Sequence, residues 1–224
     1  VLLFFGAGLN VGLSVMSKFR TEGYKTVAVA RTAKEEFKNA ADMVIAADMS
    51  EEPSQVARIF EEVTHKIGTP TVVVYNGKRN SLHNGSDPLT VSPSDFAKDL
   101  AVNATSAYAA AAAFAALPST SHPKVFIYTG NMQFSVIVDQ TVSLGAGKNA
   151  MYYVIETAAN IYGKAGKGQK GFWYVADERT EKGESVMGAI SGPAHAEFFW
   201  ELVNLKEQGP WNGTFVMGKG YKDF

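Results

Sequence analysis

Runs of consecutive apolar residues alternate along the chain with segments whose apolar residues recur at helical spacing. The first run, residues 1–5, is apolar throughout, which indicates a buried parallel strand. Similar runs predict strands at residues 25–30, 43–47, 71–75, 124–128, 172–176 and 214–217. Helical spacing predicts a helix after the first strand and further helices at residues 53–67, 94–116, 144–162 and 195–207.

Strands and helices alternate without an internal repeat or a long linker. This order predicts an α/β fold, a Rossmann-type doubly wound parallel sheet of about seven strands with helices on both faces. We expect residues 1–224 to form a single domain. The glycine- and lysine-rich stretch 163–171 predicts a loop, and the alanine run 109–113 suits close helix packing, including packing at a subunit interface.

The composition excludes several classes of partner. Hydrophobic residues make up 46% of the chain and charged residues 19%, and the formal net charge of −1 gives no electrostatic case for nucleic acid or an anionic membrane. The absence of cysteine excludes disulfides, thiolate metal sites and cysteine nucleophiles. With no membrane span or signal peptide, we expect a cytoplasmic protein that binds a small molecule and no metal. Because the chain opens directly on a strand, we expect a few native residues to precede Val1.

A glycine-rich turn, GAGLNVG at residues 6–12, joins the first strand to the first helix. A helix N-terminus offers unpaired N–H groups and the positive end of its dipole to a pyrophosphate. Small residues let the backbone approach, and Gly6 or Asn10 is suited to positive φ. The alternative is an ordinary tight turn. We predict a dinucleotide site formed by Gly6, Gly8, Asn10, Val11 and Gly12.

The residues after the second and third strands refine this prediction. An NAD site places an acidic residue after the second strand to bind the ribose, whereas this chain has Arg31 and Lys34. Because arginine binds phosphate bidentately, we predict NADP(H), with Arg31 and Lys34 near the 2′-phosphate; a solvated surface arginine is the alternative. We expect Asp48 and Met49 to hold the adenine, although Asp48 also suits a helix cap or loop.

These motifs resemble the short-chain dehydrogenase/reductase family over nearly the whole chain. The family's first turn is a glycine, three residues and Gly-x-Gly, which residues 6–12 match except that Asn10 replaces the middle glycine. Asn76 matches one position of the family's Asn-Asn-Ala-Gly motif, and Asn103 matches the helix asparagine of its catalytic tetrad. The resemblance implies an NADP(H)-dependent oxidoreductase, a cofactor contact from Asn76, and a homodimer or homotetramer.

The rest of the catalytic tetrad departs from the family pattern. The family places a serine thirteen residues before a tyrosine and a lysine four residues after it. Aligning LGAGKNA with the family's YxASKAA makes Lys148 the lysine, and places Leu144 at the tyrosine position and Asn131 at the serine position. Leucine transfers no proton, but Asn131 can donate an N–H to an oxyanion. Lys148 can bind the ribose, and burial could bring its own titration near neutrality.

A second register starts from Tyr153, which would place Thr157 at the lysine position and Gln140 at the serine position. We prefer the register that keeps Lys148. More narrowly, the segments FIYTGN, SLGAGK, YVADER and the C-terminal EQGPW…TFVMGKGYKDF resemble a divergent fungal branch of the family. Relatives of that branch combine NADPH-dependent reduction with Diels–Alder cyclisation.

Substitute proton donors are available in three places. Asp139 lies in an apolar loop, where burial would raise its pKa, and Tyr152 shares a helix face with Lys148. Glu178 and Arg179 follow the sixth strand, and the polar loop from there to Gly192 is expected to cover the pocket. Each of these residues also suits an ordinary surface, core or salt-bridge role.

Three functions follow from this altered site. The first is an NADP(H)-dependent reductase of atypical mechanism in fungal secondary metabolism. An imine or iminium, or an activated carbonyl, is its expected substrate, because an iminium accepts hydride without a proton donor. The second is a Diels–Alderase-like cyclase that uses the same pocket, with or without reduction. The third is a non-catalytic NADP-binding protein.

Overall fold

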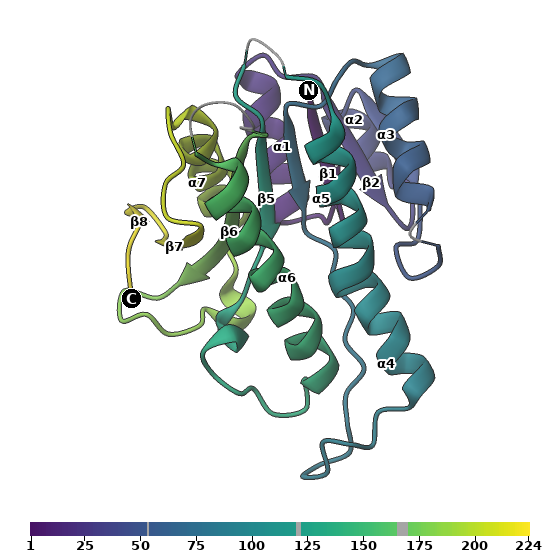
Figure 1. Ribbon diagram of the computed structural model, residues 1–224, viewed down its shortest axis with the longest axis vertical. Helices are drawn as coiled ribbons and strands as arrows, with labels where there is room; N and C mark the ends of the chain where they lie inside the picture. Colours follow the sequence, from purple (N-terminus) through teal and green to yellow (C-terminus); the bar gives the residue numbers. More distant parts are fainter. Residues whose placement is uncertain (53, 120–121, 165–169) are drawn as a thin grey trace.

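The computed structural model describes residues 1–52, 54–119, 122–164 and 170–224 (Figure 1). Within these residues one sheet holds eight strands in the order β3-β2-β1-β4-β5-β6-β7-β8. The strands are β1 (Leu2–Phe5), β2 (Thr26–Ala30), β3 (Met43–Ala46), β4 (Val72–Tyr75), β5 (Val125–Thr129), β6 (Phe172–Arg179), β7 (Asn212–Val216) and β8 (Gly220–Tyr221). Neighbours are parallel except β7 and β8. This confirms the doubly wound parallel sheet and adds a short antiparallel edge strand to the predicted number.

Helices cover both faces of the sheet (Figure 1). The face toward α3 (Gln55–Lys66), α5 (Ser106–Ala116) and α6 (Val142–Tyr162) buries Leu3 and Phe5 of β1. The opposite face packs Leu2 and Phe4 against α1 (Val11–Thr21), α2 (Glu35–Ala40) and α7 (Gly192–Asn204). Both faces of β1 are therefore buried, which explains its uninterrupted apolar sequence. The sequence pattern missed α2, a six-residue helix with one buried residue, Phe37.

The helix predicted at residues 94–116 contains a wide turn. It consists of α4 (Pro93–Leu100), a π-helical segment η1 (Ala101–Thr105) and α5. Two phenols from the sheet bind carbonyls of the wide turn: Tyr75 Oη donates to Val102 O at 2.7 Å and Tyr128 Oη to Asn103 O at 2.6 Å. Single π-helical turns are frequent at functional sites, and Asn103 lies in this one.

The sixth strand is longer than predicted. β6 continues through Asp177, Glu178 and Arg179, all of which are buried. Consecutive charged residues indicate a loop when they are read alone, but here each side chain has a partner inside the fold. The predicted helix start at residue 53 and most of the loop at residues 163–171 lie outside the described residues.

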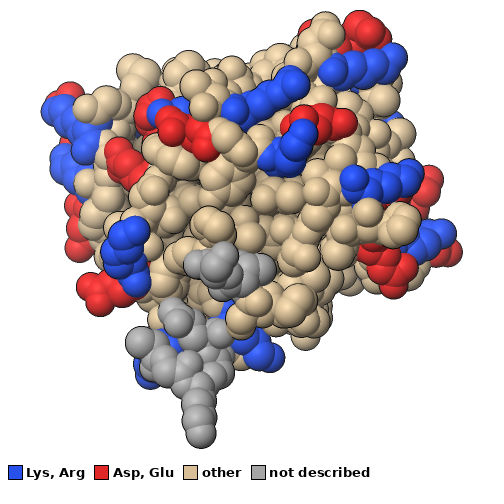
Figure 2. Space-filling view, turned by 90° about the horizontal axis from the view of Figure 1, so that it is seen from above, with Lys and Arg blue, Asp and Glu red and all other residues tan. Residues whose placement is uncertain are grey.

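The surface shows no dominant charge on the face of Figure 2, where basic and acidic side chains are interspersed. Within the described ranges, no helix is both long and apolar enough to cross a bilayer. The same residues contain no group of three or more histidine or carboxylate side chains arranged to hold a metal ion.

Candidate functional site

A cleft of about 310 Å³ opens at the carboxyl ends of β1, β2, β3 and β4. Strand order reverses between β1 and β4, and open α/β sheets bind ligands at such a point. Many of the predicted cofactor residues line this cleft: Gly6, Gly8, Arg31, Asp48, Met49 and Asn76. The other predicted residues are not part of its lining: Asn10, Val11, Gly12, Lys34 and Lys148.

The glycine-rich turn has the geometry of an anion cradle. Gly6 has φ +72°, and a Cβ on it would lie 2.5 Å from Gly77 N, so only glycine fits. Asn10 has φ −95°, so the positive φ expected at one of these two positions belongs to Gly6. The backbone N–H groups of Val11 and Gly12 donate to no group in the described part of the chain. They are the unpaired donors that an α1 N-terminus offers to a phosphate.

The Asn10 side chain extends away from this cradle. Its Nδ2 donates to Ile190 O at 2.7 Å, and its Oδ1 accepts from Gly192 N at 2.9 Å. Because both polar atoms of this side chain bond to residues 190 and 192, only the backbone of Asn10 remains for the predicted cofactor contact.

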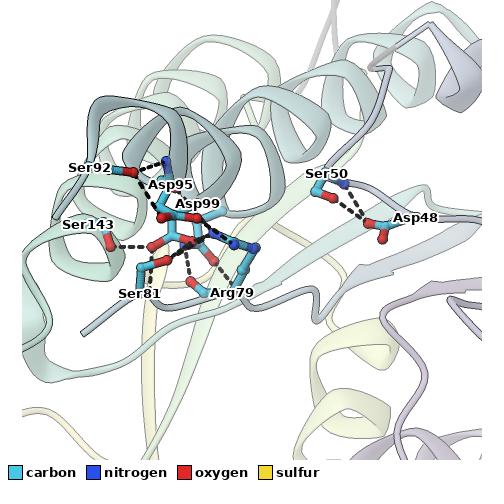
Figure 3. A network of polar contacts seen from close by, with 9 residues as sticks. Asp48, Ser50, Arg79, Ser81, Ser92, Asp95, Asp99 and Ser143 are labelled. Atoms are coloured by element: carbon cyan, nitrogen blue, oxygen red, sulfur yellow. Dashed lines mark hydrogen bonds and ion pairs between the residues drawn. The ribbon is translucent and has the colours of Figure 1, made fainter.

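Of the residues expected near the adenosine, Arg31, Asp48 and Met49 line the cleft and Lys34 does not. Arg31 is exposed at the rim of the cleft, whereas Lys34 is the exposed N-cap residue of α2. Asp48 lines the cleft and also caps a turn, because its Oδ1 accepts from Ser50 N and Ser50 Oγ, both at 2.8 Å (Figure 3). These bonds, above all the one from the backbone N–H, hold the Asp48 pKa below its ordinary value. Met49 is buried beside it.

The Asn103 side chain bonds to one backbone unit through both its amide oxygen and its amide nitrogen. Its Oδ1 accepts from Arg79 N at 3.1 Å, and its Nδ2 donates to Arg79 O at 2.6 Å. Asn103 therefore anchors the loop that follows β4. The amide predicted to be catalytic thus holds the backbone of Arg79, a residue that lines the cleft.

A buried carboxylate that sequence reasoning missed joins three segments around the cleft (Figure 3). Asp99 in α4 pairs with the Arg79 guanidinium, accepts from Ser81 N at 2.6 Å and accepts from Ser143 Oγ. Asp95 also pairs with Arg79, at 3.2 Å. In the sequence, the only sign of this carboxylate cluster was the i, i+4 spacing of Asp95 and Asp99. Because both carboxylates neutralise Arg79, this guanidinium is not free for a phosphate.

Lys148 is buried at the carboxyl end of β5. Its side chain is 2% exposed, its Nζ donates to Thr129 O at 2.6 Å, and Nζ lies 4.3 Å from the centre of the Tyr128 ring. Burial first, and then the charge of Lys78, lower the Lys148 pKa to about 7, while Asp177 opposes the shift. Leu144 is buried one helical turn earlier on the same helix.

Asn131 begins a 3-10 turn, η2 (Met132–Phe134), directly after β5. Its Oδ1 accepts from Gln133 N at 3.0 Å, and its Nδ2 donates to Gln133 Oε1 at 2.8 Å. Since an amide nitrogen carries two hydrogens, one N–H of Asn131 remains for a substrate oxygen. Tyr152 bonds to the Asn131 backbone through both its hydroxyl hydrogen and its oxygen, and burial raises its pKa. The Tyr152 phenol is thus a poor proton donor.

Asp139 is exposed, in the wall of a separate cavity of about 680 Å³ that His83 and Asn149 also line. The expectation that Asp139 is buried in this apolar loop is wrong, because residues 139 and 140 are exposed to solvent.

The end of β6 forms a cluster of buried charged groups. Arg179 pairs with Asp177 at 2.6 Å. Glu178 Oε2 accepts from Ser191 N at 2.8 Å and lies 3.5 Å from His195 Nδ1. Burial raises the pKa of Asp177 and Glu178 and lowers that of His195. Sequence reasoning named Glu178 and Arg179 but missed Asp177 and His195.

Comparisons with known proteins agree with this fold. No family model matches the chain. "Short chain dehydrogenase/reductase dmxR12" of Cryptosporiopsis sp. (strain 8999) is 39% identical to this chain. The alignment is 239 residues long and covers 100% of this chain and 94% of that protein. The chain therefore belongs to the short-chain dehydrogenase/reductase family, as the motifs predicted.

Solved structures show the same fold at low identity. A metagenomic short-chain oxidoreductase in complex with NADP has a TM-score of 0.79 at 18% identity, covering 96% of each chain. A Serratia marcescens short-chain dehydrogenase/reductase has a TM-score of 0.75 at 15% identity, covering 97% of this chain and 95% of its own. A gluconate 5-dehydrogenase from Burkholderia cenocepacia, in complex with NADP and tartrate, has a TM-score of 0.62 at 18% identity, covering 80% and 72%.

Proposed function

We propose that the protein is an NADP(H)-dependent oxidoreductase that reduces an imine, an iminium or an activated carbonyl. The observation that carries the proposal is the cleft at the sheet's reversal point, with Arg31 at its rim. Gly6 and Gly8 of the glycine-rich turn line this cleft, and the unpaired N–H groups of Val11 and Gly12 follow them in the chain. Two of the solved structures with this fold contain NADP. Family membership supports the oxidoreductase class.

The residues present fit this dinucleotide. Val11 and Gly12 would donate to the pyrophosphate, and Arg31, with Lys34 three residues further along the chain, would bind the 2′-phosphate. Asp48 and Met49 would enclose the adenine. Asn76 supports the turn, because its Nδ2 donates to Gly6 O at 3.0 Å. When bound, the reduced nicotinamide supplies the hydride.

The proton chemistry rests on Lys148 and Asn131. We assign Leu144 to the position where the family has its phenol, so the proton must come from another group or be unnecessary. Lys148 has a pKa of about 7, and its ammonium can therefore give up a proton near neutrality. The second N–H of Asn131 would stabilise a developing oxyanion. An iminium substrate accepts hydride at carbon and leaves as a neutral amine, so it requires neither group as an acid.

A titration of the purified protein with NADPH and with NADH tests the cofactor assignment. We expect NADPH to bind more tightly, and Arg31→Glu to weaken NADPH binding roughly ten- to a hundredfold while sparing NADH, because it removes a charge-assisted contact. Arg58→Glu, an exposed change on α3 outside the cleft, is the matched control. Equal affinity for both nucleotides in the wild type would contradict the assignment.

A cyclase is the second candidate function. It is favoured by the engagement of Tyr152 and Asn103 with backbone groups, which leaves few groups free for ordinary carbonyl reduction. It predicts substrate turnover that persists when NADP⁺ replaces NADPH. Tight binding of NADPH without turnover of any imine, carbonyl or polyene substrate would instead indicate a non-catalytic NADP-binding protein.

We further propose that α5 and α6 pair with a second copy of the chain. Their outer face exposes three large side chains: Tyr108 (57%), Tyr153 (74%) and Ile161 (63%). Between these helices lies a groove of about 400 Å³ whose floor includes Ala111, Ala112, Ala115 and Ala116. Small residues of this kind let another helix approach closely, and the apolar patch is of the sort that marks protein interfaces.

A further inference from the structure

The N-termini of α1 and α7 differ in how their backbone N–H groups are satisfied. At α7, Ser191 N donates to Glu178 Oε2 at 2.8 Å, Gly192 N to Asn10 Oδ1 at 2.9 Å and Ala194 N to Ser191 Oγ at 3.2 Å. Residue 193 is proline and has no N–H. The backbone N–H groups at the start of α7 therefore donate to protein acceptors, whereas those of Val11 and Gly12 in α1 donate to none in the described residues.

Asn10 belongs to both of these helix ends. Its backbone is the N-cap of α1, and its side chain bonds to Gly192 N and to Ile190 O. A Cβ at Gly192 would lie 2.5 Å from Asn10 Oδ1 and from Ser14 Oγ, so the two elements meet at a distance that only glycine allows. We refer to the two side-chain bonds of Asn10 as the Asn10 clamp.

Residues 190–192 are held from a second side by β6. Glu178 accepts from Ser191 N, and His195 Nδ1 lies 2.8 Å from Ser191 O and 3.5 Å from Glu178 Oε2. This second anchor involves no residue of the glycine-rich turn. Residues 190–192 are thus held by one anchor on the turn and by another that is independent of it.

We infer that Asn10 is a positioning residue that couples nucleotide binding to the seating of residues 190–192 against the N-terminus of α1. The inference rests on the proposed nucleotide function. A pyrophosphate on the N–H groups of Val11 and Gly12 would fix the adjoining Asn10 backbone, and thereby its side chain. Seating of residues 190–192 fixes the same side chain from the other side. Two events that order one residue stabilise each other by the same factor.

Hydrogen exchange of the Gly192 amide, followed by NMR with and without saturating NADPH, tests this coupling. In the wild type, we expect NADPH to slow exchange at Gly192 severalfold. In Asn10→Ala, we expect exchange without nucleotide to rise roughly tenfold, because a hydrogen bond is lost, and NADPH to slow it no further. Leu9→Ala, an exposed change in the same turn, is the matched control.

Gly192→Ala disrupts the Asn10 clamp from the other side, because the added Cβ would lie 2.5 Å from Asn10 Oδ1, and it should weaken NADPH binding at least as much as Asn10→Ala. The inference is overturned if NADPH slows exchange equally in the wild type and in Asn10→Ala, or if it binds the wild type without affecting Gly192. Failure of the wild type to bind NADPH would instead remove the proposed function, and the nucleotide-free comparison would then still report whether the Asn10 clamp exists.

Discussion

Replacing Leu144 by tyrosine should give the protein an ordinary carbonyl reductase activity. Leu144 and Lys148 are one turn apart on α6 and both are buried, so a phenol at position 144 would project beside the lysine ammonium. The charged form of Lys148 would lower the pKa of that phenol and make it a better acid at neutral pH.

The magnitude follows from two opposing effects. A positioned general acid contributes about 10²- to 10⁴-fold to rate, and we expect roughly the lower value in a site not otherwise arranged for it. The larger ring in a buried position costs about 1–3 kcal/mol of folding free energy. For a chain of this length, each kcal/mol lowers the melting temperature by roughly 2–4 °C, so the variant should remain folded.

The assay is NADPH oxidation, followed by absorbance, with a panel of aryl ketones and α-diketones. Leu144→Phe is the matched control, because it adds the same ring without the hydroxyl and carries the same packing cost. We expect Leu144→Tyr to exceed both Leu144→Phe and the wild type roughly a hundredfold in kcat/KM on at least one ketone.

Equal rates for the tyrosine and phenylalanine variants would refute the reasoning, since the hydroxyl would then have no role. It would mean that position 144 does not face the reacting carbonyl, and that the register built on Lys148 is incorrect. A wild type that already reduces the same ketones as fast as Leu144→Tyr would show that another group is an adequate acid.

The remaining predictions concern charge, stability and assembly. Because burial lowers the Lys148 pKa from 10.5 to about 7, the folded state binds fewer protons than the unfolded state between these values. Stability measured by urea unfolding should therefore rise with pH across that window, and this rise should shrink in Lys148→Met. Asp99→Asn should cost about 3 kcal/mol, because it removes the buried carboxylate that pairs with Arg79, whereas the exposed Asp95→Asn should cost about 1 kcal/mol or less; similar losses would contradict the role given to burial. Ile161→Lys should lower the molar mass measured by light scattering to that of a monomer, and Leu89→Lys, on an exposed loop, should not; a wild type that is itself monomeric would exclude the proposed interface.

The features that sequence reasoning predicted well are those fixed by local patterns. Residues 1–5 are apolar because both faces of β1 are buried, and the turn after them requires glycine at Gly6 for reasons of backbone geometry. Both properties are visible in a short window of sequence. The place of Arg31 at the rim of the cleft follows directly from its position after β2.

Features that depend on distant partners could not be predicted in the same way. The amide of Asn103 pairs with the backbone of Arg79, and no spacing rule links these two positions. β6 retains its pairing through Asp177, Glu178 and Arg179 because partners in α7 and β6 itself satisfy these charges. Asp139 illustrates the opposite error, since an apolar neighbourhood in sequence does not ensure burial in the fold.

The aromatic floor beneath Lys148 has a consequence for the timing of proton supply. On the side of the sheet, the ammonium meets the face of the Tyr128 ring and the Thr129 carbonyl, and the Tyr128 hydroxyl is itself committed to Asn103 O. None of these groups can refill an emptied amine with a proton from water. If Lys148 is the acid, as proposed, a bound substrate that shields its amine from water would let it act as an acid a single time, and the amine would be recharged only after the product has left.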